Sequence, residues 1–458
     1  MAVAKKKKEV VDENAGMMAA LQSAAPKGED AYTWEISRTT NLVLSKIKYV
    51  LTTGIEPFDD VVGGLPIGRM VELYGLESCG KTAMAIRCAA RAMKNHISEV
   101  VREADDSMSL KSIPPNKCKV VVVYIDNEQS LDDDLKLVVD GEQLDVIGAR
   151  LDTTDDMFKA IDTAIAFQEK RMVMEEDDGI KRFLLIVVDT IASTSTKQEL
   201  EQKWGTPDFP RQPQQISKAL RQLTRRVNQS NTCVLFTNQV RTKFSGGQAA
   251  GGKQTFAIQA DDYTTPGGFA LRFYASHRVF MYAFQQKYKL LPDAQFSAGL
   301  LVGFHTKKNR LRPPLRDGRM VLLFDAKQGG LNNVFSMLET LVFFGFVEVA
   351  AESKHTGYTL KFKANNILPT TFEASKVETT LEEDEDAPVA RRGSSRKDPG
   401  FKFRSEWPQF YADHKEDVDK LWKAAVAYAM ATEGLDGGVQ VTEEEHPTNT
   451  PTARLEEE

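Results

Sequence analysis

A glycine-rich segment carries the residue types that bind nucleotide phosphates. Gly75-Leu-Glu-Ser-Cys-Gly80-Lys81-Thr82 has a glycine, four free positions, and then glycine, lysine and a hydroxyl residue. Glycines let the loop amides point inward at phosphate oxygens, and the following helix presents its positive end. Lys81 would then reach the β- and γ-phosphates, while the Thr82 hydroxyl would ligate Mg²⁺. We expect the other contacts to the nucleotide from Gly75, Glu77, Ser78, Cys79, Gly80 and Ala83.

Two apolar runs end in carboxylates that suit phosphoryl transfer to water. Residues 183–189 end in Asp189, in the form of a Walker B strand whose aspartate holds the Mg²⁺ shell. Residues 120–126 lead to Glu128, which is placed to act as a base facing the γ-phosphate. Each has a structural alternative, because any buried strand can end in aspartate and the helix dipole favours an acid at a helix N-terminus.

These residues all follow predicted strands. Between residues 41 and 325, β-rich apolar runs alternate with helical segments, which predicts an α/β domain with a largely parallel sheet, extended by antiparallel strands in its last third. Such sheets bind ligands at the carboxyl ends of their strands, so the candidate residues should converge on one edge. The expected strands are residues 69–74, 119–126, 183–189, 232–238, 278–284, 300–307 and 320–324.

Composition narrows the class of protein. Four scattered cysteines without CxxC spacing indicate neither a zinc site nor a disulfide framework, so a reducing cytoplasm is expected. No apolar stretch approaches the roughly 18 residues of a membrane span, and the first ten residues lack an apolar signal core. The net charge of −6 hides acidic segments at 373–386 and near the C-terminus and a basic region at 197–319. This layout predicts a basic working face with acidic tails, or alternatively a solvated mixed-charge surface.

The order of motifs resembles that of the bacterial and phage RecA recombinases, over roughly residues 51–362. The resemblance implies a RecA-like P-loop ATPase core with a mostly parallel central sheet, an N-terminal polymerisation segment and a small α+β C-terminal domain. The motifs are Thr53-Gly54, Gly64-Leu-Pro-Ile-Gly-Arg69, the phosphate loop, Ile125-Asp-Asn-Glu128, Val187-Val-Asp-Thr-Ile-Ala192, Gln229-Ser-Asn-Thr232, Asn238-Gln-Val-Arg241, Thr264-Thr-Pro-Gly-Gly268 and Ala270-Leu-Arg-Phe-Tyr-Ala-Ser276.

The resemblance also implies ATP and Mg²⁺ as cofactors and assigns roles around them. Glu128 matches the glutamate that activates water, and Gln239 the glutamine that senses the γ-phosphate and relays its presence to the DNA loops. Asp132 matches an acid near the adenine, whereas Leu135 stands where the family often has an aromatic residue that stacks on the base.

Further roles concern the neighbouring subunit. Lys308 and Arg310 resemble a basic pair that reaches across to the neighbouring subunit's nucleotide. Arginine stands second where lysine is usual, so a planar fork replaces a point charge. Phe273 matches an interface phenylalanine that couples nucleotide state to the filament; alternatively it is a core residue.

DNA contacts are expected from two loops, residues 197–213 and 241–266, and from one helix. The second loop combines glycines, cations and aromatic residues, as single-strand binding requires. Gln214 stands where the family has a DNA-contacting arginine. The expected DNA contacts are Arg211, Arg221, with Arg225 and Arg226 nearby on the helix, Arg241, Lys243, Phe244, Lys253, Gly267 and Gly268.

The expected organisation has five segments. They are an N-terminal arm and polymerisation segment (1–50), the ATPase core with its DNA loops (51–328), a small C-terminal α+β domain (329–372), an acidic and Ser/Arg-rich linker (373–398) and a helical segment with an acidic tail (399–458). For 399–458 the sequence indicates no role.

The resemblance implies an ATP-dependent homologous recombinase and DNA-dependent ATPase of recombination and repair. Such a protein forms a helical filament on single-stranded DNA and pairs it with homologous double-stranded DNA. Single-strand-binding and mediator proteins would be further partners, and the location would be the cytoplasm, at the nucleoid or at replication sites. Two alternatives are a hexameric helicase with the same fold and a recombination mediator with little ATP turnover.

Overall fold

The computed structural model describes most of the expected core and part of the C-terminal region. Contacts divide the chain into Met1–Ile47 and Lys48–Glu458, and the fold below is that of the second unit. No described helix is both long and apolar enough to cross a membrane. The described residues are 47–102, 108–129, 145–201, 212–242, 263–266, 269–284, 288–291, 294–324, 330–350, 357–360, 400–401 and 404–431.

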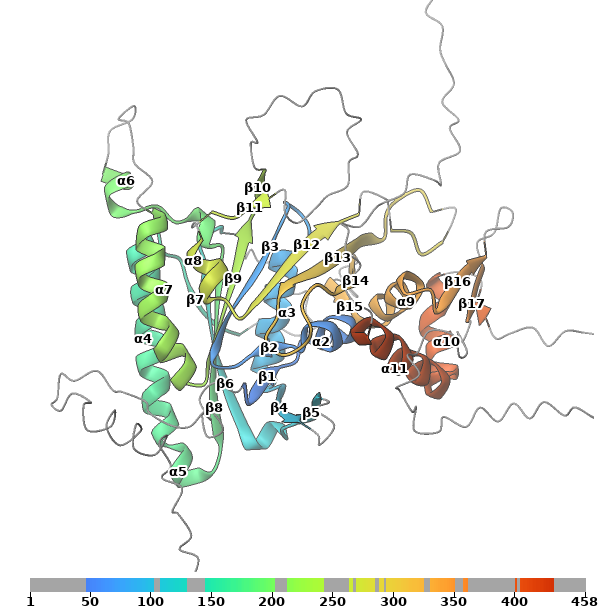
Figure 1. Ribbon diagram of the computed structural model, residues 1–458, viewed down its shortest axis with the longest axis horizontal. Helices are drawn as coiled ribbons and strands as arrows, with labels where there is room; N and C mark the ends of the chain where they lie inside the picture. The colour runs from blue at the N-terminus through green and yellow to red at the C-terminus, as the bar shows by residue number, and fades with distance from the viewer. Residues whose placement is uncertain are drawn as a thin grey trace, which may run out of the picture. The chain divides into compact units, whose positions relative to one another are not determined.

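The main sheet has the strand order β15-β14-β13-β12-β3-β9-β8-β6-β7 (Figure 1). Strands β12, β3, β9, β8, β6 and β7 run parallel, and β13, β14 and β15 continue the sheet in antiparallel pairs. All seven strands expected from the sequence are present, so the predicted fold class is confirmed. The bounds are β3 Arg69–Gly75, β6 Cys118–Asp126, β7 Ile147–Ala149, β8 Lys181–Asp189, β9 Thr232–Gln239, β12 His277–Ala283, β13 Gly299–Lys308, β14 Asp317–Leu323 and β15 Gly330–Asn332.

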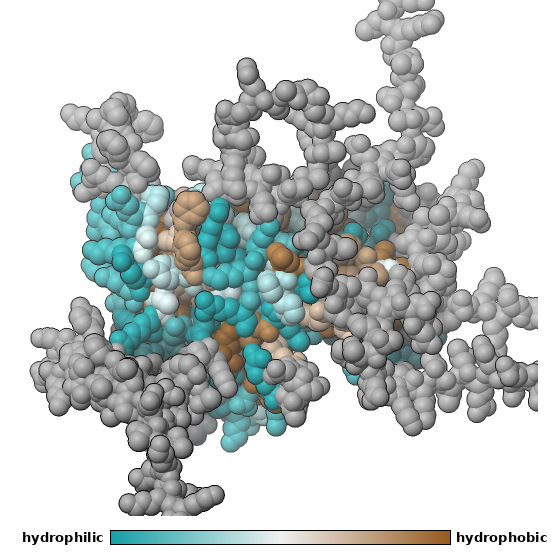
Figure 2. All heavy atoms as spheres, in the orientation of Figure 1, coloured by the Kyte–Doolittle hydropathy of each residue, from teal (hydrophilic) through white to brown (hydrophobic). Residues whose placement is uncertain are grey.

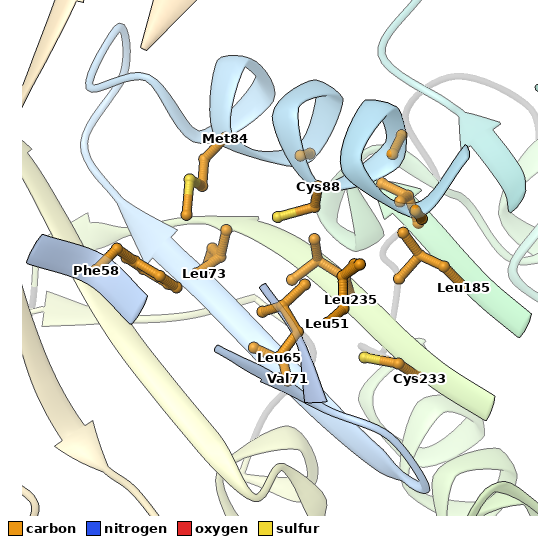
Figure 3. Packing of buried hydrophobic residues seen from close by; sticks show 14 of the residues in the cluster. Leu51, Phe58, Leu65, Val71, Leu73, Met84, Cys88, Leu185, Cys233 and Leu235 are labelled. Carbon is orange, nitrogen blue, oxygen red and sulfur yellow. The ribbon is translucent and has the colours of Figure 1, made fainter. Parts of the chain in front are cut away.

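Helices cover both faces of the parallel strands. Because side chains alternate across a strand, neighbouring residues of β8 belong to different cores: Leu185 packs with α3 (Lys81–Met93), and Leu184 packs with α4 (Thr154–Val173) and α7 (Gln212–Gln229). In Figure 3, Met84 and Cys88 of α3 point at the strand residues of the first core. Burial on both faces explains why the sequence shows continuous apolar runs here.

A smaller sheet holds the beginning of the described chain. It has the order β2-β1-β4-β5, with β1 (Tyr49–Leu51) between β2 (Leu65–Pro66) and β4 (Ile97–Arg102), and β5 (Met108–Ser112) at the edge. Val50 and Leu51 are buried in the core of the same chain. The expected boundary between residues 50 and 51 therefore falls inside a strand. The helix α2 (Glu56–Val62) follows β1.

The two expected C-terminal segments share one core. Helix α9 (Asn333–Phe343) packs with α10 (Trp407–Asp413) and α11 (Lys415–Ala431) in a single hydrophobic cluster that includes Leu338, Trp407 and Leu421. Strands β16 (Val347–Ala350), β17 (Gly357–Leu360) and β18 (Gly400–Phe401) form one antiparallel sheet. Residues 333–350, 357–360, 400–401 and 404–431 thus form one unit, which we call the C-terminal unit.

Short elements complete the described chain. They are η3 (Pro115–Lys117), α5 (Glu175–Asp178), η5 (Ile191–Ser193), α6 (Lys197–Glu201), β10 (Arg241–Thr242), β11 (Tyr263–Thr264), α8 (Ala270–Tyr274) and η7 (Arg404–Glu406).

Candidate functional site

The phosphate loop connects the carboxyl end of β3 to the first turn of α3. Gly80 has φ +85°, a conformation that favours glycine, immediately before the helix begins at Lys81. At Gly75, a Cβ atom would lie 2.0 Å from the Met281 carbonyl oxygen, so only glycine lets β12 pass this close. The first turn of α3 contains no acidic residue. The positive end of the helix can therefore attract an anion, which fits a phosphate cradle.

Lys81 lies folded over this loop. Its Nζ donates hydrogen bonds to the Leu76 carbonyl at 2.6 Å and to the Gly75 carbonyl at 3.2 Å. Cys79 is buried beneath, and burial raises the pKa of its thiol, an effect that the nearby Lys81 ammonium opposes. The loop thus already contains the cation that phosphate oxygens require. Glu77 and Ser78 are exposed, whereas Thr82 and Ala83 are half-buried in the first turn of α3.

Asp189 ends β8 in a buried position, with 1% of its surface exposed. Its two carboxylate oxygens accept hydrogen bonds from the Tyr124 hydroxyl at 2.9 Å and the Thr237 hydroxyl at 2.5 Å. Burial raises the pKa of Tyr124 well above its usual value, and the Asp189 charge adds to that effect. The tyrosine therefore remains a neutral donor. Since each carboxylate oxygen can accept more than one bond, Asp189 keeps acceptor capacity for the water shell of a metal ion.

Glu128 and Gln239 meet although 111 positions separate them in the sequence. Gln239 Nε2 donates a hydrogen bond to Glu128 Oε1 at 3.0 Å. The Glu128 and Asn127 amides both donate to the Asp189 carbonyl, at 3.2 and 2.8 Å, which ties the turn after β6 to the end of β8. The predicted convergence of Glu128, Asp189 and Gln239 on one edge of the sheet is thus present in the structure.

Lys308 and Arg310 lie elsewhere. In the sheet, Lys308 of β13 pairs with Arg278 of β12, and Arg278 pairs with Glu72 of β3. Glu72 lies three residues before Gly75, where the phosphate loop begins. Three residues correspond to about 10 Å along a strand, and β12 lies between β3 and β13. The chain turns away after Lys308, so this basic pair lies toward the amino end of β3, away from the phosphate loop of the same chain.

Lys308 is held against α8. Its Nζ donates to the carbonyls of Arg272 at 3.0 Å and Phe273 at 2.8 Å, and burial, with Arg310 and Arg278 nearby, lowers its pKa. Arg310 is exposed. Phe273 is 73% exposed, so the alternative that it is a core residue is wrong. Phe269, whose carbonyl accepts from the Phe273 amide at 3.4 Å, is 70% exposed, and Figure 2 shows a hydrophobic patch over α8.

Three of the described DNA candidates lie on α7. Arg221 and Arg225 are exposed, whereas Arg226 forms ion pairs with Asp162 and Glu169 of α4. Its positive charge is therefore partly neutralised within the protein. Strand β10, which contains Arg241, pairs with β11 at the base of the second expected loop. Asp132, Leu135, Arg211, Lys243, Phe244, Lys253, Gly267 and Gly268 lie outside the described residues.

A buried network under the site was missed by sequence reasoning. Glu72 is fully buried and pairs with Arg278 at 2.5 Å, and its other oxygen accepts a hydrogen bond from Asn238 Nδ2 at 3.0 Å. Asn238 also donates to the Pro266 carbonyl at 3.2 Å, so the residue before Gln239 is tied to the end of the second loop. The sequence contains one sign of this network, a glutamate inside an apolar strand. A buried glutamate requires a partner for its charge.

Comparison with known proteins agrees with this geometry. Residues 45–328 match the RecA N-terminal domain family. The chain is 29% identical to Protein RecA of Thermus aquaticus over 63% of this chain and 69% of that protein. It is 28% identical to the plasmid Protein RecA of Lactococcus lactis over 66% and 72%, respectively. To the mitochondrial DNA repair protein recA homolog 3 of Arabidopsis thaliana it is 30% identical, over 60% and 53%. The chain belongs to the RecA family.

Proposed function

We propose that this protein is an ATP-dependent homologous recombinase, which forms filaments on single-stranded DNA and pairs it with homologous duplex DNA in recombination and repair. The observation that carries the proposal is the 3.0 Å hydrogen bond between Gln239 and Glu128. Gln239 ends β9 just before β10, which forms the base of the second loop. A change at the γ-phosphate would therefore move a residue joined directly to the DNA loop.

ATP would occupy the phosphate loop. Lys81 would leave its carbonyl partners for the β- and γ-phosphates, and the loop amides and the N-terminus of α3 would complete the cradle. Thr82 and Asp189 are the proposed holders of Mg²⁺, which when bound with ATP neutralises phosphate charge. Asp132 is the proposed contact at the adenine.

Glu128 would accept the proton of the water that attacks the γ-phosphate. A general base must lie within hydrogen-bond reach of that water, and its carboxylate must be oriented toward it. The Gln239 amide supplies this hold by donating to one oxygen of Glu128, which leaves the other to face water. Hydrolysis would then be coupled to DNA binding through the same glutamine.

The site would be completed by a second subunit. Lys308 and Arg310 would contact the nucleotide of the neighbouring copy, since they lie away from the phosphate loop of their own chain. A repeated contact of this head-to-tail kind generates rings or open helices. Phe273 and Phe269 would be covered in the same contact, because large exposed apolar side chains that lie together mark interaction sites.

DNA would lie along the second loop and α7. Arg221 is exposed and suited to a phosphate contact, and we propose Arg241 at the base of the loop as another. The remaining proposed contacts are Arg211, Lys243, Phe244, Lys253, Gly267 and Gly268. We further propose that the protein acts in the cytoplasm, at the nucleoid or at replication sites, with single-strand-binding and mediator proteins as partners.

Electron microscopy with single-stranded DNA and a slowly hydrolysed ATP analogue tests the proposal, together with a strand-exchange assay. We expect helical filaments, and exchange with a homologous duplex but not with a heterologous one. Closed rings that unwind DNA in one direction would instead indicate a helicase. Filaments with negligible stimulation of ATP turnover by DNA, and no exchange, would indicate a mediator.

A further inference from the structure

The connection between β13 and β14, residues 309–316, carries Arg310 and is fixed at its start by α2. Asn309 Nδ2 donates to the carbonyl of Val62, the last residue of α2, at 2.9 Å. Asn309 Oδ1 accepts from the amides of Leu311 at 2.8 Å and Arg312 at 3.0 Å, which closes a tight turn around Arg310. The backbone on either side of Arg310 is thus tethered to the C-terminal end of α2.

The end of the same connection is fixed by the C-terminal unit. The Arg316 amide donates to the Thr306 hydroxyl at 2.9 Å, and the Arg316 guanidinium donates to the Met430 carbonyl of α11 at 3.3 Å. The Met430 side chain packs against the core of the ATPase domain. Helix α11 therefore contacts the connection and the core at its C-terminal end.

A second contact joins α11 to α2. Trp422 Nε1 donates to Asp60 Oδ2 at 2.8 Å, and the two helices pack together. Asp60 is half-buried, and Arg312 of the Arg310 connection lies near enough to attract its charge. Burial raises the pKa of Asp60, while the Trp422 hydrogen bond and Arg312 oppose the rise. Asp60 is thus the point at which α11, α2 and the connection meet.

We propose that α11 is a positioning element for the Arg310 connection, and that Trp422 acts through Asp60 as its positioning residue. The inference rests on the proposed function, in which Arg310 reaches the nucleotide of the neighbouring subunit. Loss of the Trp422 donor leaves the half-buried Asp60 carboxylate short of a partner and frees α2 to shift. Since a displacement of about 1 Å at a reacting group costs up to about 100-fold in rate, a small shift is enough to matter.

The test compares two tryptophans of the C-terminal unit. Trp422→Phe removes the donor to Asp60, and Trp407→Phe removes a matched donor, which bonds the Val334 carbonyl at 2.6 Å. For Trp422→Phe we expect kcat of DNA-stimulated ATP hydrolysis to fall about fivefold, with KM for ATP and single-stranded DNA binding unchanged. Trp407→Phe should keep the wild-type kcat. Equal kcat values for the two variants would overturn the inference.

A second arm shows whether Trp422 acts through Arg310. In an Arg310→Ala background, Trp422→Phe should lower kcat no further, because the group that it positions is gone. A further fivefold fall there would overturn the inference. If Trp422→Phe does not fold, as judged by circular dichroism, Asp60→Ala, which removes the acceptor of the same bond, takes its place with the same two expectations. Absence of DNA-stimulated ATP turnover in the wild-type protein would contradict the proposed function itself. If the wild-type protein shows this turnover and Trp422→Phe has the same kcat, only this inference is contradicted.

Discussion

The phosphate-loop edge of the sheet and the Arg310 connection hold their cations in different surroundings. At the first, Lys81 lies over carbonyls of its own loop, and Glu128 and Asp189 stand at the ends of nearby strands of the same chain. At the second, Arg310 is exposed and lies near other cations, including Lys308 and Arg69. The first region has both signs of charge within one chain. In the second, cations gather around Arg310, which would favour an anion from outside.

The difference indicates how a site can be divided between two copies. The phosphate loop of one subunit can bind a nucleotide by itself. A guanidinium that lies away from that loop can stabilise the charge of the reaction only at a nucleotide bound by another copy. One chain alone would then bind ATP and hydrolyse it slowly. Turnover would depend on assembly, and so on the DNA that organises the assembly.

The largest effect is expected at the phosphate loop. Lys81→Ala removes the ammonium from the cradle, so DNA-stimulated ATP turnover should fall by about 1000-fold. Lys111→Ala, on the exposed edge strand β5, is the matched control and should be active. A steady-state phosphate-release assay measures both. Turnover of Lys81→Ala within tenfold of the wild-type value would place the chemistry elsewhere.

Glu128→Gln should separate binding from chemistry at the same edge. The amide oxygen can still accept from Gln239, but the side chain no longer takes a proton, so kcat should fall by about 100-fold. The variant should still bind a fluorescent ATP analogue and form filaments with wild-type affinity for the nucleotide. A proportional loss of ATP affinity would show instead that Glu128 serves the binding of the nucleotide.

Arg310→Ala should affect only the second region. We expect DNA-stimulated kcat to fall by about 30-fold, while ATP binding to the protein without DNA is unchanged. Arg310→Lys keeps the charge and should retain more activity than Arg310→Ala, though less than wild type because the planar fork is lost. Stopped-flow nucleotide binding and turnover assays distinguish these effects. Weaker ATP binding by the isolated Arg310→Ala subunit would contradict a role in trans.

Low pH should lower the free energy of unfolding through protonation of His277, near the second region. His277 is a fully buried residue at the start of β12. Burial, with Arg310 and Arg69 nearby, lowers the pKa of His277 to about 3. The unfolded chain binds this proton at a higher pH, so stability should fall as pH drops from about 6.5 toward 3, by about 2 kcal/mol at pH 5. Urea unfolding should show a flatter pH dependence for His277→Asn, and an unchanged slope would refute the assignment.

The smallest expected effect compares two arginines of α7. Arg221→Ala should reduce the salt dependence of single-stranded DNA binding by about one unit of log–log slope, since one phosphate contact is lost. Arg226→Ala should leave that slope unchanged, because Arg226 is paired with Asp162 and Glu169, and should cost at most about 1 kcal/mol of stability. Fluorescence anisotropy over a salt series provides the measurement, and equal slopes for both variants would contradict the distinction.

Local patterns predicted the strands and the phosphate loop well, and the contacts between distant segments poorly. The phosphate loop and the strands ending in Asp189 and Gln239 follow from apolar runs and turn chemistry, which act over short sequence distances. The pairing of Glu72 with Arg278 joins residues 206 positions apart, and no periodicity encodes it. The same holds for the bond between Trp422 and Asp60, which unites segments that the sequence suggested were separate.

Mixing two inactive variants tests the divided site most directly. Lys81→Ala subunits keep Arg310, and Arg310→Ala subunits keep the phosphate loop, so in an equal random mixture about one quarter of the subunit contacts would combine both intact parts. We predict that DNA-stimulated ATP turnover of the mixture recovers to about a quarter of the wild-type value. Turnover that stays at the average of the two separate variants would contradict the claim that the site is completed between copies.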